Sequence, residues 1–296
     1  MEYIDYYLNK AINKAIINKD IESQQKELGE LKKGITGAIK NKKNFNYFYP
    51  QEDSFQKLPE NSVLIKIPFT LKKPYTSKGE DEFCLLPDWV EDKEKKPTYN
   101  PIIRDKFFDC PMVRPSSWKG HLRYAAEMIE EGYENKKTNI IERLFGFEDI
   151  GFEEKDALKG RLYFFPTFFY EESKRDVITP LNRKTRTPTS GPIDIEIMNR
   201  GSKGEFHLLY FPYPGNKESK NIEVKEDLIF LTEALALMFY TYGFSAKKTS
   251  GFGVIEKELD GGKIWFKSKL KVLPGDFNTL NELKIKIDEL WSKVSE

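Results

Sequence analysis

The segment at residues 227–240 constrains the fold most, because it is the most apolar helix-like stretch of the chain. It reads DLIFLTEALALMFY, and Gly243 follows it as a residue that suits the end of a helix. A helix with so few polar side chains must be buried on several sides. We therefore expect the remaining elements to enclose it in one substantial core.

Strand-like patterns precede and follow this helix. Residues 63–71 alternate between faces and are rich in β-branched side chains, which predicts a first strand. An earlier helix is predicted from residue 118 to about residue 133. The order of strand, helix, strands, helix, strand predicts an α+β fold, a ferredoxin-like (RRM-like) palm with long insertions. The further strand patterns lie at residues 160–170, 193–197, 206–211, 254–259 and 263–266.

The charge of the chain is nearly balanced, with 48 Lys and Arg residues against 47 Asp and Glu residues among 296. Any affinity for nucleic acid must therefore come from local basic clusters rather than from net charge. The two cysteines, Cys84 and Cys110, lack metal-ligand spacing, and no apolar run reaches the ~20 residues that cross a bilayer. We expect a cytoplasmic protein that does not associate with membranes.

A Pro-Ser-Ser turn at residues 115–117 opens the earlier helix. Such a turn leaves backbone N–H groups free in the first helical turn, where the helix dipole favours negative charge. Basic side chains at Arg114, Lys119 and Arg123 add full positive charges beside this turn. The sequence therefore predicts an anion site here, and phosphate is the anion that fits it best.

A second element of the same character follows the apolar helix at residues 243–253. Its glycines allow a ligand to approach the backbone closely, and Lys247 and Lys248 lie inside the loop. Neither this loop nor the Pro-Ser-Ser turn matches a nucleotide-binding motif, which disfavours small-nucleotide cofactors. Two separated loops of one chemical character predict a polyanionic ligand.

Candidate catalytic groups are scarce. A pair of histidines, His121 and His207, could act as acid and base, although ordinary packing is the favoured interpretation for each. The carboxylates of Asp88, Glu91 and Asp92 could bind a divalent ion, but they lie in a long charged loop, where solvated side chains are the default.

Two further segments point outward from the predicted core. Residues 1–60 carry apolar side chains at helical spacing between lysines, which predicts a helical arm that caps the core or contacts RNA. A basic excursion between two strand patterns contains Arg183, Lys184 and Arg186 among prolines and threonines. It is equally consistent with an exposed turn and with a protruding finger.

These motifs, taken in order, resemble the RAMP superfamily, and especially the backbone subunits of type III CRISPR effector complexes. The family carries a Pro-Gly-Ser-Ser-Leu-Lys-Gly-like turn before a helix with an arginine, which is similar to residues 115–123. Residues 100–105, 144–146 and 249–253, with the strand after Gly160, also match the family's order. The resemblance covers residues 63–259, and its motifs are individually weak but fairly specific as an ordered set.

The resemblance implies a palm that holds CRISPR RNA and a thumb, at about residues 171–200, that enters the guide–target duplex. It implies an arm at residues 1–60, a core at residues 61–270 and a C-terminal helix at residues 271–296. The implied partners are CRISPR RNA, target RNA and other RAMP subunits of the complex. The residues expected to contact RNA are Arg104, Ser116, Ser117, Lys119, Arg123, Arg183, Lys184, Arg186, Lys247, Lys248, Gly251, Phe252 and Gly253.

One position departs from the target-cleaving members of the family. Those subunits place a catalytic aspartate where this chain has Tyr99, and a phenol is neither a metal-binding carboxylate nor a base at neutral pH. We therefore expect a non-cleaving backbone or end-capping subunit without a cofactor. The alternatives are a nuclease that uses a divalent metal at Asp88 or Asp92, a histidine-dependent repeat-processing endoribonuclease, and a protein that contacts only other proteins.

Overall fold

The computed structural model describes residues 48–50, 55–78, 99–105, 110–133, 135–147, 158–179, 182, 184–185, 187–188, 192–213 and 221–295. Most of the predicted arm at residues 1–60 therefore lies outside the described residues. The same holds for Asp88, Glu91, Asp92, Arg183 and Arg186.

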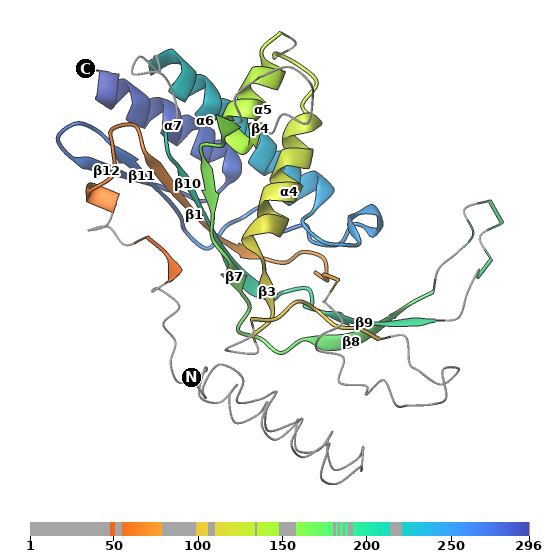
Figure 1. The fold of residues 1–296 in the computed structure, drawn as a ribbon. Coiled ribbons are helices and arrows are strands. Elements are labelled where there is room, and N and C mark those ends of the chain that lie inside the picture. Colours follow the sequence, from red (N-terminus) through yellow and green to blue (C-terminus); the bar gives the residue numbers. More distant parts are fainter. Residues whose placement is uncertain are drawn as a thin grey trace, which may run out of the picture.

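Among the described residues, five strands form an antiparallel main sheet in the order β12-β11-β1-β10-β6 (Figure 1). The central strand is β1, in which Val63 lies opposite Tyr210 on one side and Phe266 on the other. The strands are β1 (Val63–Thr70), β6 (Leu162–Phe164), β10 (Lys203–Tyr210), β11 (Gly262–Lys267) and β12 (Val272–Phe277).

Four helices accompany this sheet in the described part of the chain, and together they give a mixed α+β fold. Alternate side chains of β1, beginning with Val63 and ending with Phe69, are almost fully buried beneath the helices. Trp118 of α4 packs its ring against Phe206 of β10, and Trp291 of α7 packs against Phe266 of β11. The helices are α4 (Pro115–Glu127), α5 (Lys137–Phe145), α6 (Asn221–Ala236) and α7 (Leu280–Ser295).

The apolar segment at residues 227–240 forms the buried helix that its composition predicts. It belongs to α6, which begins earlier, at Asn221, and continues into a π-helical segment, η4 (Leu237–Tyr242). Gly243 ends the helix with φ 75°, and a Cβ there would lie 2.3 Å from the Phe252 carbonyl oxygen. Glycine is therefore required where the helix passes into the loop that follows.

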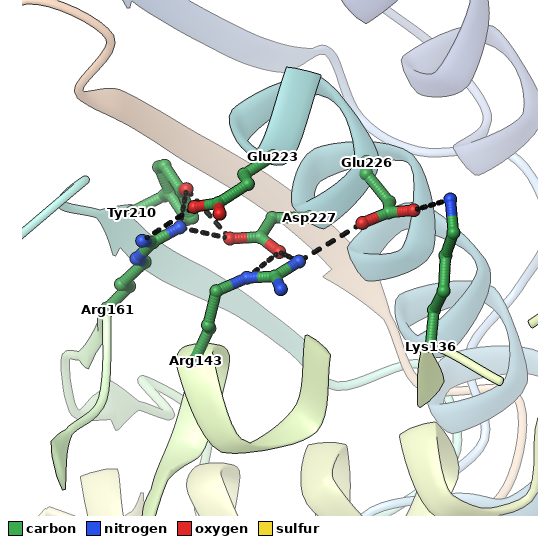
Figure 2. A network of polar contacts seen from close by, with 7 residues as sticks. All are labelled: Lys136, Arg143, Arg161, Tyr210, Glu223, Glu226 and Asp227. Atoms are coloured by element: carbon green, nitrogen blue, oxygen red, sulfur yellow. Dashed lines mark hydrogen bonds and ion pairs between the residues drawn. The ribbon is translucent and has the colours of Figure 1, made fainter. Parts of the chain in front are cut away.

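A buried ionic network holds α6 against its neighbours (Figure 2). The Asp227 side chain is fully buried, and its Oδ1 accepts hydrogen bonds from Arg143 Nε (3.0 Å) and Nη2 (2.7 Å). Its Oδ2 accepts from Arg161 Nη1 (2.8 Å) and from the Tyr210 hydroxyl (2.9 Å). The network joins α5 and the segment before β6 to α6, so it fixes the helix that leads into the glycine-containing loop.

The predicted thumb is a hairpin whose strands project from the main sheet (Figure 1). Strand β8 (Lys174–Ile178) pairs with β9 (Ile193–Ile197), and β9 pairs in parallel with the short β2 (Tyr99–Asn100). Most described side chains of β8 are exposed, and Val177 retains 53% of its surface. Strand β8 therefore contributes little to the core, whereas Ile195 and Ile197 of β9 are buried.

Some boundaries differ from those expected from the sequence. The earlier helix begins at Pro115, a residue suited to the first helical turn, and ends at Glu127. The alternating residues 254–259 form no strand, because Ile255 makes only a single bridge to Leu71. The segment at residues 271–296 supplies strand β12 to the sheet before its helix begins at Leu280.

Two short pairs of strands complete the described architecture. Strand β3 (Met112–Val113) pairs with β7 (Thr167–Phe168), and β4 (Gly146–Phe147) pairs with β5 (Leu158–Lys159). None of the described helices has the length and apolar character that a bilayer crossing requires.

Candidate functional site

The first turn of helix α4 faces solvent, because Trp118 anchors the opposite side of the helix in the core. Trp118 is fully buried, and its Nε1 donates a 3.1 Å hydrogen bond to the Thr167 hydroxyl of β7. Ser116 and Lys119 consequently lie exposed, and Ser117 is half-buried. The first turn carries no acidic residue and no side-chain cap, so its N–H groups are left to an external acceptor.

The loop at residues 243–253 uses its glycines for two different purposes. Gly253, with φ 79°, lies against the backbone of the same loop, and a Cβ there would lie 2.7 Å from the Ser245 nitrogen. Gly251 has φ 77°, but a Cβ there would meet nothing within 4 Å. Lys247 is exposed beside this open backbone, and Phe252 is half-buried. The loop is packed tightly at its base and open at its tip.

The start of α4 and this loop lie side by side in the structure. Lys248 Nζ lies 3.4 Å from the centroid of the Tyr124 ring, which is a close cation–π contact. Beneath it, the Trp118 and Phe244 rings are 4.5 Å apart. We call the region that these contacts join the α4–loop surface. Its residues are exposed or half-buried, and they are Ser116, Ser117, Lys119, Arg123, Lys247, Lys248 and Gly251.

The electrostatics of the α4–loop surface favour an anion. Burial, together with the nearby Lys248, lowers the pKa of the His121 imidazole to about 4, so this side chain is neutral at pH 7. Partial burial also lowers the pKa of Lys248. Arg123 pairs with Glu127 at 3.1 Å, which offsets part of its charge. Lys119, Lys247 and Lys248 are thus the main cations of the surface.

Arg104 is half-buried and bonds to residues of the hairpin rather than to the α4–loop surface. Its guanidinium forms an ion pair with Glu196 of β9 and donates a 2.6 Å hydrogen bond to the Ser173 hydroxyl. The Glu196 carboxylate has a lowered pKa, because these partners and the Ile102 N–H outweigh the effect of burial. Arg104 therefore contributes to the base of the hairpin.

The described part of the hairpin tip is a hydrogen-bonded turn. The Asn182 side chain accepts hydrogen bonds from the Lys184 and Thr185 N–H groups at 2.8 and 3.2 Å. Lys184 is exposed, whereas the expected partners Arg183 and Arg186 lie outside the described residues. The turn holds Lys184 at the end of the projecting strands.

The two histidines lie on opposite faces of the main sheet. Phe206 of β10 packs on Trp118 of α4, and His207 is the next residue of the same strand. The His207 side chain therefore points to the other face of the sheet, away from α4, which carries His121. The His207 ring stacks on Tyr49 with centroids 3.8 Å apart, and burial and Lys66 lower its pKa to about 3. The two rings cannot form a joint acid–base pair.

Metal chemistry finds no support in the described residues. In that part of the chain, no three His, Cys, Asp or Glu side chains gather closely enough to hold an ion. The carboxylates considered from the sequence, Asp88, Glu91 and Asp92, lie outside it. Tyr99, the residue that the resemblance sets against an aspartate of cleaving members, is in β2 and pairs with Asp194 of β9.

Sequence patterns had not revealed two contributors to the site. Tyr124 lies two turns after the Pro-Ser-Ser motif, and its role appears only when Lys248 is found over its ring. Glu196 alternates with isoleucines, a pattern that predicts exposure, yet it is only 7% exposed. In each case the role of the residue depends on a partner that is distant in the sequence, so no local pattern reveals it.

Comparisons with known proteins point to one protein family. The model of the RAMP superfamily matches residues 34–256, well over half of the chain. The curated CRISPR system Cms endoribonuclease Csm3 of Enterococcus italicus is 25% identical over 193 residues, which cover 62% of this chain and 83% of that protein.

Two solved structures are similar at lower identity. The Csm3-Csm4 subcomplex of the type III-A CRISPR-Cas interference complex has a TM-score of 0.43 and 16% identity, and the match covers 78% of this chain and 96% of that one. The type III-B Cmr-beta complex bound to cognate target RNA has a TM-score of 0.41 and 14% identity, with coverage of 89% and 78%. On the extent of the family match, this chain belongs to the RAMP superfamily.

Proposed function

We propose that this chain is an RNA-binding subunit of a type III CRISPR ribonucleoprotein in the cytoplasm. Its α4–loop surface holds phosphates of the guide RNA, and its β8–β9 hairpin shapes the guide–target duplex. The observation that carries the proposal is the 3.4 Å contact of Lys248 with Tyr124, which joins two elements that are far apart in the sequence and are both expected to bind phosphate. The curated relative's name supports the assignment to a CRISPR system.

The topology supports a ferredoxin-like palm. Helix α4 follows β1, α6 follows β10, and the strands lie in the order β11-β1-β10-β6 with each neighbour antiparallel. This is the arrangement of two interlocked strand–helix–strand units. Strand β12 and α7 extend the palm beyond that minimal unit.

The chemistry of the α4–loop surface suits a single-stranded polyanion. Free N–H groups at a helix start bind one phosphate, and flanking lysines neutralise the next ones along the strand. Gly251, whose Cβ position has no neighbour within 4 Å, lets the backbone approach the strand without a side chain in between. Tyr124 and Phe252, both half-buried, are placed to contact sugars or bases.

A salt series on guide RNA binding tests the proposal. For single strands, log K falls with log salt with a slope of about −0.7 for each neutralised phosphate. We expect Lys119→Ala and Lys248→Ala each to weaken binding and to make the slope shallower by about 0.7. The matched control is Lys269→Ala, an exposed lysine in the turn between β11 and β12, which should change neither quantity. Wild-type affinity in both surface variants would refute the proposal.

Cleavage of target RNA is the second candidate, because the curated relative is named an endoribonuclease. A metal-dependent cut by this chain needs a carboxylate in place of Tyr99, and Asp88 or Asp92 would have to supply it. Incubating the assembled complex with complementary RNA and Mg²⁺ separates the two functions. Cuts that disappear in Asp88→Ala or Asp92→Ala would favour the nuclease, and intact RNA favours the non-cleaving subunit.

A further inference from the structure

The base of the β8–β9 hairpin is held by one buried carboxylate. Both oxygens of Glu196 are used, since Oε2 accepts the Ile102 N–H at 3.0 Å while Oε1 accepts from Arg104 and from the Ser173 hydroxyl. Arg104 also donates to Ser173, which closes a ring of three side chains. The carboxylate thus joins the segment after β2, the residue before β8 and strand β9.

The same residue is linked through its backbone to the glycine-containing loop. The Glu196 carbonyl accepts a 2.8 Å hydrogen bond from the Thr76 hydroxyl. The Thr76 backbone in turn exchanges two bonds with the Ser245 hydroxyl, which accepts from the Thr76 N–H (3.0 Å) and donates to the Thr76 carbonyl (2.8 Å). The same carbonyl also accepts from the Ala246 N–H at 3.0 Å. Glu196, Thr76 and Ser245 are all buried, so water competes weakly for these bonds.

A continuous chain of hydrogen bonds therefore runs from the hairpin to the α4–loop surface. At one end are Arg104 and Ser173 at the base of the hairpin, and at the other is Ser245, two residues before Lys247. Backbone bonds between Met198 and Tyr75 lie beside this chain and add rigidity. Within the described residues, strand β8 is exposed, and β9 meets the rest of the protein only near its end, at β2 and at the buried Ile195 and Ile197, so the orientation of the hairpin depends on the attachment at its base.

We propose that Glu196 is a positioning residue that fixes the angle between the β8–β9 hairpin and the α4–loop surface, so that both act on one RNA strand. This inference rests on the proposed function for the RNA, but the geometry itself can be tested without RNA. Glutamine at this position keeps the shape of the side chain. Its amide nitrogen would face a donor, Arg104 or Ile102, which breaks the ring.

The first arm of the experiment measures a distance distribution in the free protein. Nitroxides at Thr185→Cys in the hairpin turn and Thr249→Cys in the loop, with both native cysteines replaced by serine, are read by double electron–electron resonance. We expect a narrow distribution in this background and a broader or displaced one in Glu196→Gln. The matched control is Asp176→Asn, which removes the same charge from an exposed position on β8 and should leave the distribution narrow.

A second variant covers the case in which Glu196→Gln fails to fold. Ser173→Ala removes one donor of the ring without leaving an amide against a donor, and we expect a smaller broadening. A distribution unchanged in both variants, or broadened equally by Asp176→Asn, would overturn the proposal. Thermal unfolding of each variant is recorded in parallel, so that loss of the whole fold is not mistaken for rotation of the hairpin.

The second arm measures RNA binding. We expect Glu196→Gln to hold single-stranded guide RNA within about twofold of the wild type, because the α4–loop surface is intact. Binding of target RNA to the guide-loaded protein should weaken about tenfold, as when one well-placed charged contact is lost. Equal weakening of both steps would assign Glu196 a general structural role instead. If the wild type binds no RNA at all, the proposed function fails while the distance measurement still decides the geometry.

Discussion

At the scale of single residues, two glycines of the loop, Gly251 at its tip and Gly253 at its base, separate backbone strain from packing. Both Gly251 and Gly253 have φ near 78°, in the left-handed region, but only Gly253 lies against other backbone atoms. Gly251→Ala should cost about 1 kcal/mol from strain alone. Gly253→Ala adds a clash with the Ser245 nitrogen, and we expect a loss of at least about 2 kcal/mol.

Urea unfolding at pH 7 measures this pair of variants under the same conditions. Equal losses of unfolding free energy in the two variants would show that the base of the loop can rearrange to accommodate an added methyl group. Gly251→Ala also reports on ligand contact, because a methyl group at the open tip should weaken RNA binding even though the fold persists.

The stacked imidazole of His207 predicts a pH dependence of stability. Its pKa is about 3 in the folded protein and 6.5 in the unfolded chain, so the unfolded state binds a proton first as the pH falls. The stability that the neutral His207 side chain contributes is therefore present above pH 6.5 and is lost progressively toward pH 3. At pH 5 the loss should be about 2 kcal/mol.

The variant His207→Phe keeps a ring on Tyr49 and removes the proton site. Its free energy of unfolding, measured by urea between pH 7 and pH 5, should fall less steeply than that of the wild type. Equal decreases in the free energy of unfolding of both proteins between pH 7 and pH 5 would contradict this prediction. His121, whose pKa is also lowered, contributes equally to both proteins and does not disturb the comparison.

The positions of single residues were predicted well from the sequence where they depend on neighbouring residues of the chain. The positions of Ser116, Lys119 and Gly243 follow from rules about helix ends, and the structure places them at such ends. Glu196 was missed, because its burial depends on Arg104, and strand alternation carries no information on such a distant partner.

At the scale of elements, α6 depends on its buried charge as well as on its apolar surface. Asp227→Asn would leave Arg143 and Arg161 without their shared carboxylate, and breaking a buried ion pair from one side costs about 3–5 kcal/mol. The control Glu226→Gln removes a partly exposed partner of Arg143 from the same network and should cost less than about 1 kcal/mol.

Guanidinium chloride titration of the two variants checks this prediction, with intact RNA binding by Glu226→Gln as a test that the surface persists. Similar small losses in both variants would mean that Asp227 is replaceable, and that apolar packing alone holds α6. The network joins α5 and α6 to Tyr210 of sheet strand β10, so its loss should loosen the start of the loop through α6 (Figure 2).

Long apolar or alternating segments were predicted correctly from the sequence, whereas one short alternating segment was not. The strand at residues 63–71 and the helix at residues 227–240 are present because burial enforces a regular pattern on them. The alternating residues 254–259 failed as a strand. The Ile255 and Glu256 N–H groups donate to the Phe239 and Thr70 carbonyls instead of to a neighbouring strand. These acceptors are distant in the sequence, so the local pattern does not reveal them.

At the scale of the whole molecule, the order of the elements could be predicted from sequence patterns, but the position of α4 beside the loop after η4 could not. Residues 115 and 248 are separated by most of the palm, and only the antiparallel sheet brings α4 and the loop after η4 to one side of it (Figure 1). The hairpin lies beyond the end of this surface and is tied to it through Thr76 and Glu196. One strand of RNA could therefore meet both.

The most direct test of the account is photocrosslinking of a guide RNA that carries 4-thiouridine at every uridine, with the attached peptides identified by mass spectrometry. We predict crosslinks to residues 116–124 and 247–253 from neighbouring nucleotides of one RNA molecule, both lost in 1 M salt. Crosslinks confined to other surfaces of the palm, or to only one of these two segments, would contradict the claim that they hold the same strand.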